Sequence, residues 1–321
     1  MSAWTWHGGQ LAQARAAFGD TAEPWIDLST GINPHAWPGV GELAIDWARL
    51  PDPGALADLE AIAAACFGAD PACVLALPGS EIGLRLLGER LPGPVRHVRP
   101  GYRTHGEMVP DAVPVASGAV NPAEGTLIVA NPNNPDGRLI PAATLRAQMA
   151  RGWLVLDEAF ADADPRHSLA GEVGAGRRLI VLRSFGKFFG LAGVRLGFLI
   201  APPALAAELR ARIGAWPVSA AAIAIGSAAY RDAAWIAAMR IRLTEAAAAL
   251  DQLLEARGYT VTGACPLFRL IETDDAHRLF ECLARRSILT RPFDYDRRWL
   301  RIGLPRDADA LARLGAALAD A

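Results

Sequence analysis

The sequence has few cysteines, no long apolar run and no leader-like N-terminus. Its four cysteines, Cys66, Cys73, Cys265 and Cys282, form no C-x-x-C pair and have no histidine-rich stretch near them. We therefore expect buried free thiols and no metal site. No run of about 18 apolar residues occurs, so we expect no membrane span. The N-terminus has no basic segment followed by an apolar core, so we expect no signal peptide and a cytoplasmic location.

The sequence also lacks a strong excess of charge. Its formal net charge is −2, which gives no indication of a nucleic acid or an anionic membrane as partner. Hydrophobic residues make up 52% and charged residues 21%, which is typical of a globular protein and excludes a disordered one. A chain of 321 residues has room for two domains, or for one large domain with a smaller lobe.

Apolar runs alternate with helical patterns through the middle of the chain. We expect strands over 72–77, 95–98, 112–115, 126–130, 153–157, 178–183 and 194–200, and helices over 55–67, 78–91, 141–151 and 203–213. This alternation predicts an α/β fold with a mostly parallel central sheet and helices on both faces. Ligands of such sheets bind beyond the carboxyl ends of the strands.

The last third of the chain predicts a separate, smaller α/β unit. A long helical stretch over 219–257 leads into expected strands at 266–271, 288–291 and 298–303 and helices at 274–286 and 306–320. We therefore divide the chain into an N-terminal arm (1–50), a large domain (51–215) and a small C-terminal domain (216–321).

A lysine in an unusual setting suggests covalent chemistry. Lys187 stands among glycines and phenylalanines in the segment 184–197, directly after the apolar run 179–182. Desolvation in such a setting lowers the pKa of a lysine from about 10.4 and makes its amine a nucleophile. Lysine amines form Schiff bases with carbonyl compounds, pyridoxal phosphate (PLP) among them. Ser184 and Arg195 supply donors suited to a phosphate. The alternative is a surface lysine in a glycine-rich loop.

Two upstream segments strengthen the first interpretation. The segment 131–137 follows the apolar run 126–130 and contains Asn134, and Asp157 ends a second apolar run. The order Asn134, Asp157, Lys187, with Arg195 after the lysine, resembles the fold-type I PLP enzymes of the aminotransferase class I/II group. The resemblance implies that Lys187 and Asp157 are catalytic. It implies that Asp157 binds the pyridine nitrogen of PLP and that Asn134 binds its phenolic oxygen. It also assigns PLP binding to the large domain.

Two further segments are candidates for cofactor contacts. Pro78-Gly79-Ser80-Glu81 opens a predicted helix, whose free N–H groups and dipole attract phosphate. Gly79, Ser80 and Glu81 are therefore candidate cofactor-binding residues, although an ordinary serine N-cap gives the same pattern. Tyr102 follows the strand 95–98, where an aromatic ring can stack on a flat cofactor. The alternative for Tyr102 is a tyrosine on the rim.

Anion-binding candidates occur at both ends of the chain. His7-Gly8-Gly9 and the segment 28–34 combine polar side chains with flexible backbone, as a loop around a small anion requires, although ordinary turns look alike. Arg291 and Arg301 lie at strand-like positions, and arginine forks bind carboxylates and phosphates. Charges on the outer face of a strand are the alternative, and Arg269 is a weaker third candidate. The candidate substrate-binding residues are His7, Gly8, Gly9, Thr30, Gly31, Asn33, Asn134, Arg291 and Arg301.

The arm narrows the resemblance within the PLP group. His7-Gly8-Gly9, the segment 27–34, the segment 184–193 and Asp157-Glu158-Ala159-Phe160 resemble the threonine-phosphate decarboxylases of cobalamin biosynthesis, which are related to the histidinol-phosphate aminotransferases. The resemblance implies conversion of a phosphorylated amino acid, L-threonine O-3-phosphate, to (R)-1-amino-2-propanol O-2-phosphate by a homodimer. An arm that contributes to the substrate site is part of this expectation.

Two positions depart from the related aminotransferases. They usually have tyrosine where this chain has Phe160, which favours the decarboxylase. They also tend to have tyrosine where this chain has Leu50, and that tyrosine reaches across the dimer to the cofactor phosphate. A histidinol-phosphate-type aminotransferase and a non-catalytic binding protein remain the alternatives.

Overall fold

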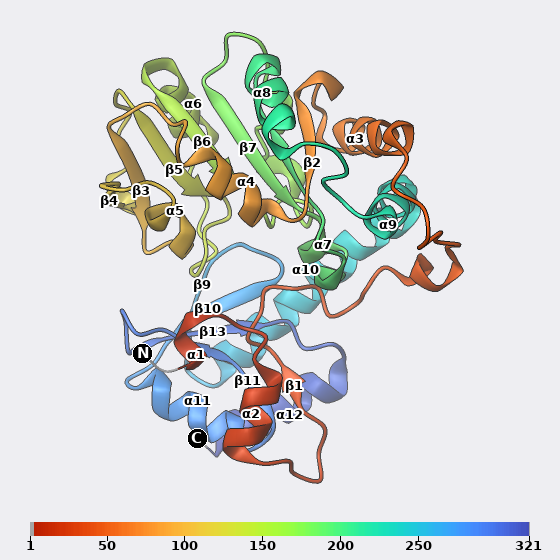
Figure 1. Cartoon of the computed structure of the whole chain (residues 1–321). Coiled ribbons are helices and arrows are strands. Elements are labelled where there is room, and N and C mark those ends of the chain that lie inside the picture. The colour runs from red at the N-terminus through yellow and green to blue at the C-terminus, as the bar shows by residue number, and fades with distance from the viewer. Residues whose placement is uncertain (1–2, 321) are drawn as a thin grey trace. The chain divides into compact units, whose positions relative to one another are not determined.

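The computed structural model describes residues 3–320, which pack into two compact units. Of these residues, unit 1 comprises 3–35, 135–138 and 239–320, and unit 2 comprises 36–134 and 139–238 (Figure 1). The expected division into an arm, a large domain and a small domain assigned a role to each part, and those roles stay a prediction. The units have other bounds because α9 (Ala220–Arg231) packs against α3 (Pro53–Phe67) in unit 2, and because α10 (Ala233–Ala256) passes from one unit into the other.

A seven-stranded sheet forms the centre of unit 2. Its order is β2-β8-β7-β6-β5-β3-β4, and β8 alone runs antiparallel to its neighbours. The strands are β2 (Val74–Leu77), β3 (Val95–Arg99), β4 (Val113–Ala116), β5 (Thr126–Ala130), β6 (Trp153–Asp157), β7 (Leu179–Ser184) and β8 (Gly197–Ile200). The predicted α/β fold with a mostly parallel sheet is confirmed.

The central strands are apolar on both faces, which is why they read as continuous hydrophobic runs. One face packs on α4 (Ser80–Leu87) and α8 (Pro203–Ile213), with Leu77, Val155 and Leu182 among the buried side chains between them. The other face packs on α3 and α9 through Phe67, Phe198 and Tyr230. The remaining helices of unit 2 are α5 (Arg103–Glu107), α6 (Ala142–Arg151) and α7 (Phe185–Phe188), with short 3-10 turns at Pro38–Glu42, Pro71–Cys73, Ser117–Ala119, Pro165–His167, Ala170–Glu172 and Ala192–Val194.

Unit 1 is built on a four-stranded antiparallel sheet of order β12-β13-β10-β9. Its strands are β9 (Thr260–Thr262), β10 (Phe268–Glu272), β12 (Arg291–Pro292) and β13 (Trp299–Gly303). A parallel pair, β1 (Ile26–Asp27) and β11 (Ile288–Leu289), ties the N-terminal arm to the C-terminal part of the chain. The helices are α1 (Ala3–Trp6), α2 (Leu11–Phe18), α11 (Ala276–Ala284), α12 (Ala308–Ala319) and most of α10.

Several expectations about single features are corrected. The helical stretch 219–257 is two helices, α9 and α10, that meet at Asp232. All four cysteines are free, but Cys66 is exposed and Cys282 is half-buried, so only Cys73 and Cys265 fit the expected buried thiols.

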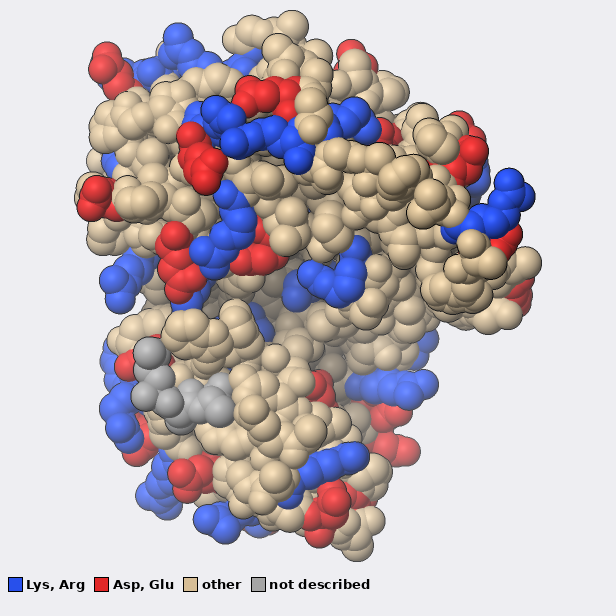
Figure 2. All heavy atoms as spheres, viewed as in Figure 1, with Lys and Arg blue, Asp and Glu red and all other residues tan. Residues whose placement is uncertain are grey.

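Within residues 3–320 no helix is long and apolar enough to span a membrane. Acidic and basic side chains are interspersed on the face shown in Figure 2, in line with the small net charge.

Candidate functional site

The carboxyl ends of β5, β6 and β7 bring three predicted residues to one edge of the unit 2 sheet. Asp157 is the last residue of β6, Ser184 is the last residue of β7, and Lys187 follows in α7. The parallel register pairs Ala130 with Asp157 and Asp157 with Leu182, so neighbouring strands end at the same level. This edge is where ligands of parallel sheets bind. Lys187 is half-buried, and its Nζ lies 5.9 Å from the ring centroid of Phe160.

The loop after β5 is held in place by two asparagines on either side of the expected ligand Asn134. Asn131 Oδ1 accepts a hydrogen bond from Ile140 N at 2.9 Å, which closes the loop on itself. Asn133 Nδ2 donates to Pro100 O at 3.1 Å and ties the loop to the segment after β3. The sequence offers three asparagines in this loop, and two of them have these structural roles.

A buried histidine supports Asp157, and the sequence analysis missed it. His105 Nε2 lies 3.0 Å from Asp157 Oδ2, with side-chain exposures of 1% and 7%. Ala159 N also donates to Asp157 Oδ1 at 3.1 Å. His105 reaches the carboxylate because α5 begins at Arg103, directly after Tyr102. Helical periodicity gives no signal for a five-residue helix, so Tyr102 was the only residue of this segment that the sequence singled out.

Glu81 supports Tyr102 in the structure. The Tyr102 hydroxyl donates to Glu81 Oε2 at 2.9 Å, and Thr104 Oγ1 and Arg85 Nε donate to the same carboxylate. Burial, followed by the Glu81 charge, raises the pKa of Tyr102 to about 12, so its hydroxyl stays protonated at neutral pH. The ring packs edge-on to His105 with centroids 5.6 Å apart. Tyr102 is thus fixed beside the Asp157–His105 pair.

An anion cradle lies at the start of α4. Gly79 precedes the helix with φ +97°, a conformation that favours glycine. A Cβ on Gly79 would lie 2.5 Å from Arg195 Nη2, so a larger residue here would displace the end of this guanidinium. Leu77 on β2 and Ser184 on β7 both pair with Gly197 of β8, which brings Ser80 and Ser184 to the same end of the sheet. Backbone N–H groups, hydroxyls and one guanidinium together suit a phosphate.

Unit 1 brings two arginines face to face. Arg291 of β12 and Arg301 of β13 are cross-strand partners. Arg301 is 2% exposed and donates from Nη2 to Ser29 O at 2.7 Å, and Arg291 Nη2 donates to Trp6 O at 3.2 Å. Burial, and then the charge of Arg291, lower the pKa of Arg301 to about 9. Two positive charges side by side make a site that gains stability when it binds an anion.

The glycine-rich arm packs beside these arginines, within unit 1. A Cβ on Gly8 would lie 2.3 Å from Ser29 O, and Gly9 N donates to Ser29 Oγ at 2.8 Å. Residues 7–9 and the segment 27–33 therefore form one surface with the Arg301 guanidinium, and Thr30 and Gly31 continue the chain there. His7 is exposed, whereas Asn33 is buried and accepts a hydrogen bond from His35 N at 2.9 Å.

The structure corrects the sequence-based suggestion that Arg269 binds an anion. Its Nε and Nη2 donate to Asp251 at 2.5 and 2.9 Å, and its Nη1 donates to Cys265 O and Phe268 O. Arg269 therefore joins β10 to α10 as an internal ion pair. Arg301 pairs with Leu270 across the sheet, so adjacent Arg269 lies on the other face.

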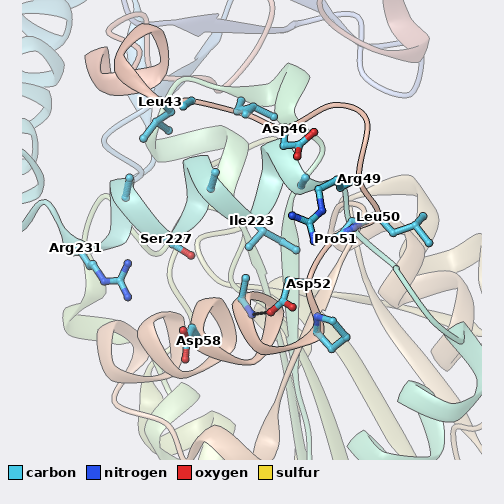
Figure 3. Close-up of a pocket in the computed structure, with 17 residues that line it drawn as sticks. Leu43, Asp46, Arg49, Leu50, Pro51, Asp52, Asp58, Ile223, Ser227 and Arg231 are labelled. Atoms are coloured by element: carbon cyan, nitrogen blue, oxygen red, sulfur yellow. Dashed lines mark hydrogen bonds between the residues drawn. The ribbon is translucent and has the colours of Figure 1, made fainter.

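A cavity of about 840 Å³ lies elsewhere in unit 2, between the segment 43–58 and α9 (Figure 3). Its polar lining includes Asp46, Arg49, Asp58 and Arg231. None of the predicted cofactor-binding or catalytic residues lines it. Its volume is within the range of small-molecule pockets. The candidate catalytic residues Asp157 and Lys187 lie instead at the ends of the strands of unit 2.

Comparisons with known proteins agree with this arrangement. A sequence profile of aminotransferase class I and II matches residues 116–318. The chain is 42% identical over 335 residues to a threonine-phosphate decarboxylase of Sinorhizobium sp, covering 99% of each protein. It is 39% identical over 332 residues to a threonine-phosphate decarboxylase of Pseudomonas aeruginosa, covering 97% of this chain and 96% of the relative.

The fold is likewise similar to solved structures. The histidinol-phosphate aminotransferase of Sinorhizobium meliloti, solved in complex with pyridoxal-5'-phosphate, superposes with a TM-score of 0.78 at 20% identity. The match covers 97% of this chain and 96% of that one.

The contrast between Arg301 and Arg269 gives a stability prediction. Arg301→Met removes a buried charge that lies beside another positive charge, but it also removes the donor to Ser29 O, so we expect the free energy of unfolding to fall by about 1 kcal/mol. Arg269→Met leaves Asp251 without its main partner, and we expect a loss of about 3 kcal/mol. Urea denaturation of both variants measures the difference. An equal loss in both would show that Arg301, too, has a structural role.

Proposed function

Because the chain belongs to the aminotransferase class I and II family, we propose that it is a PLP-dependent decarboxylase of L-threonine O-3-phosphate. The products are (R)-1-amino-2-propanol O-2-phosphate, an intermediate for cobalamin, and CO2. The observation that carries the proposal is the similarity over nearly the whole chain to two threonine-phosphate decarboxylases. A location in the cytoplasm accords with such an enzyme and is part of the proposal.

The residues present in unit 2 fit PLP. The cofactor has an aldehyde, a pyridine nitrogen and a phosphate, and the sheet edge offers a lysine, a buried carboxylate and an anion cradle. A buried carboxylate is costly unless it has a partner, and the Asp157 carboxylate contacts the imidazole of His105 and the backbone N–H of Ala159. A protonated ring nitrogen would supply the missing cation. When bound, PLP supplies an electron sink for the bond that breaks.

Each residue of unit 2 has a defined task in this proposal. Lys187 Nζ would hold the aldehyde group and would deliver a proton to the substrate carbon that loses CO2. Asp157 would hold the proton on the ring nitrogen, and Asn134 would donate to the phenolic oxygen. Tyr102 would cover the ring. The phosphate would be held by Gly79, Ser80, Ser184 and Arg195, and Glu81 supports Tyr102.

Unit 1 supplies the groups that distinguish the substrate. We assign the substrate phosphate and carboxylate to Arg291, Arg301, His7 and the backbone of Gly8, Gly9, Thr30 and Gly31, with Asn33 shaping the segment. A decarboxylase must hold the Cα–carboxylate bond upright over the ring. Binding energy from the remote phosphate can be directed to that orientation.

Phe160 favours decarboxylation over the aminotransferase alternative. Its ring lies near Lys187 Nζ, on the turn that follows Asp157, and it is 5% exposed. A phenylalanine offers no hydroxyl donor at this position. The related aminotransferase in the structural comparison shares only 20% identity, which supports the fold and not its reaction.

The reaction itself gives the first test of function. We expect the purified protein with PLP to release CO2 and aminopropanol phosphate from threonine phosphate without any keto acid. Threonine without phosphate should react at least about 100-fold more slowly, because the remote binding energy is lost. Isotope release from carboxyl-labelled substrate and mass spectrometry of the amine measure both. Turnover that requires 2-oxoglutarate and yields glutamate without CO2 would instead establish an aminotransferase.

The attachment of the cofactor gives a second test. Lys187 is the only lysine in the sequence, so no other lysine side chain can replace it. We expect borohydride to fix PLP covalently to the wild-type protein and not to Lys187→Ala. Intact-mass measurement shows the added mass and peptide mapping locates it. The matched control is Arg195→Met, which should bind PLP more weakly but still show the link. A label retained in Lys187→Ala would rule out the assignment.

We further propose that the chain acts as a homodimer. Trp47 is 77% exposed and Leu50 is 67% exposed, on the segment that lines the cavity of Figure 3. Large apolar side chains on one exposed segment indicate a protein interface, and a second copy is the commonest partner. Leu50 also stands where related enzymes have a residue that contacts the other subunit.

Light scattering tests the dimer. We expect twice the chain mass at micromolar concentration for the wild-type protein. Trp47→Asp should weaken the dimer, because it removes exposed apolar area and introduces a charge. Val113→Asp is the control, because it introduces the same charge at an exposed apolar residue of unit 2 on the edge strand β4. A fully active wild-type monomer would refute the dimer.

A further inference from the structure

A cluster of buried charges lies behind the candidate cofactor site, and the proposed mechanism does not use it. Arg183 donates from Nη1 to Glu158 Oε2 at 2.8 Å and from Nη2 to Asp162 Oδ1. Ser168 Oγ donates to Glu158 Oε2 at 2.6 Å, and Leu169 N donates to Glu158 Oε1 at 2.7 Å. The side chains of Arg183 and Glu158 are 1% and 0% exposed. We call Glu158, Asp162, Ser168 and Arg183 the Arg183 cluster.

The chain connects this cluster directly to the site. Glu158 follows Asp157, and Arg183 precedes Ser184. Side chains alternate between the faces of a strand, so Asp157 and Ser184 share one face while Glu158 and Arg183 share the other. Glu158 N also donates to Leu182 O at 2.9 Å, which extends the β6–β7 register by one residue. The salt bridge therefore clamps the two strand ends that carry the site.

Aromatic contacts extend the cluster to the lysine helix. Arg183 Cζ lies 4.7 Å from the ring centroid of Phe67. The Tyr230 ring lies 5.7 Å from Phe185 and 4.9 Å from Phe189, which flank Lys187 in sequence. Burial, and then the charge of Asp162, raise the pKa of Tyr230 well above its usual value, so its hydroxyl stays protonated. The helix α7, which carries Lys187, thus packs on Tyr230. Tyr230 in turn contacts Phe67, whose ring lies beside Arg183.

Stability alone does not account for three charges in this position. Burial raises the pKa of Glu158, although Arg183 and Ser168 act against the shift. Burial lowers the pKa of Arg183, but the charges of Asp162 and Glu158 raise it by more. The net pKa lies above the ordinary value for arginine, so Arg183 stays charged. Well-packed apolar side chains of similar volume are often as stable as a buried ion cluster or more stable. What an ion cluster adds is a fixed geometry, because forked hydrogen bonds allow few arrangements.

We propose that Arg183, held by Glu158 and Asp162, is a positioning residue that fixes the distance between the Asp157 carboxylate and the Ser184–Lys187 segment. In the proposed function Asp157 would hold the ring nitrogen and Lys187 would hold the aldehyde, so both residues would have to be placed for the same cofactor. The cluster sets their separation before the cofactor arrives, so that less free energy is lost in ordering the site. This inference rests on the proposed PLP function.

Three variants of graded severity test the proposal. Arg183→Lys keeps the charge and loses the fork, Glu158→Gln keeps the shape and loses one charge, and Ser168→Ala loses one hydroxyl. The readouts are the PLP dissociation constant of the apoprotein, from fluorescence titration, and the pH at which the visible absorbance of bound PLP changes. We expect the dissociation constant to rise about 10-fold or more for Arg183→Lys and Glu158→Gln, and about 3-fold for Ser168→Ala, as for partners that orient other ligand-binding groups. In Arg183→Lys and Glu158→Gln, the pH at which the visible absorbance of bound PLP changes should also shift.

The control is a second carboxylate–arginine pair in unit 2, away from the site, in which the carboxylate of Glu60 is buried and Arg210 is 45% exposed. Glu60 accepts hydrogen bonds from Arg210 at 2.8 Å and from Ala76 N at 2.9 Å. Arg210→Lys should lower the melting temperature and leave PLP affinity and the absorbance transition unchanged. Equal effects in Arg210→Lys would show general destabilisation and overturn the positioning role.

The outcomes separate this inference from the proposed function. A wild-type protein that binds no PLP contradicts the proposed function. A wild-type protein that binds PLP, together with folded Arg183 cluster variants of unchanged affinity and absorbance, contradicts the positioning role alone. Ser168→Ala removes only one oxygen atom, so it provides a folded test even if the two stronger variants fail to fold.

Discussion

The parallel register of β5, β6 and β7 is the constraint on which the candidate site depends. It sets Ala130 beside Asp157 and Asp157 beside Leu182, so the residues that follow each strand emerge at one edge. A shift of one residue in β6 would turn Asp157 to the opposite face and place Glu158 in its position. The backbone bond from Glu158 N to Leu182 O and the salt bridge from Glu158 to Arg183 both oppose such a shift.

The chain treats its buried charges in two ways. Glu158, Asp162 and Arg183 in unit 2, and Arg269 with Asp251 in unit 1, neutralise one another internally. Arg301 is as deeply buried, yet its neighbour across the strand is a second arginine. Asp157 is likewise buried beside a histidine. Internal pairs hold geometry, whereas in the proposed function the buried groups beside a like charge or a histidine are the ones that bind charged ligands.

Much of the fold, and the place of some candidate site residues at the sheet edge, could be predicted from the sequence, for local reasons. The apolar runs at 126–130 and 153–157 match β5 and β6 residue for residue, because both strands are buried on both faces. Asp157 and Lys187 follow such runs and so fall at the sheet edge. The boundary between the two units could not be predicted from the sequence, because it depends on where α9 and α10 pack and not on composition.

The pairings of side chains could not be predicted. Arg269 and Arg301 both stand between apolar residues in strands, and only the cross-strand register places them on opposite faces with different neighbours. His105 lies 52 residues before Asp157, and the short helix that aims it has no periodic signal. Such contacts follow from tertiary packing, which a single sequence does not encode in any local pattern.

The central claim is that Asp157 keeps the pyridine nitrogen of the cofactor protonated. The substitution Asp157→Asn tests it most directly. It keeps the shape of the side chain and can keep the contact with His105, while it removes the negative charge. The account predicts that the variant binds PLP within about 10-fold of the wild-type affinity and loses turnover by about 100-fold or more. Near-normal turnover with bound PLP would contradict the account, because it would show that the ring nitrogen does not depend on this carboxylate.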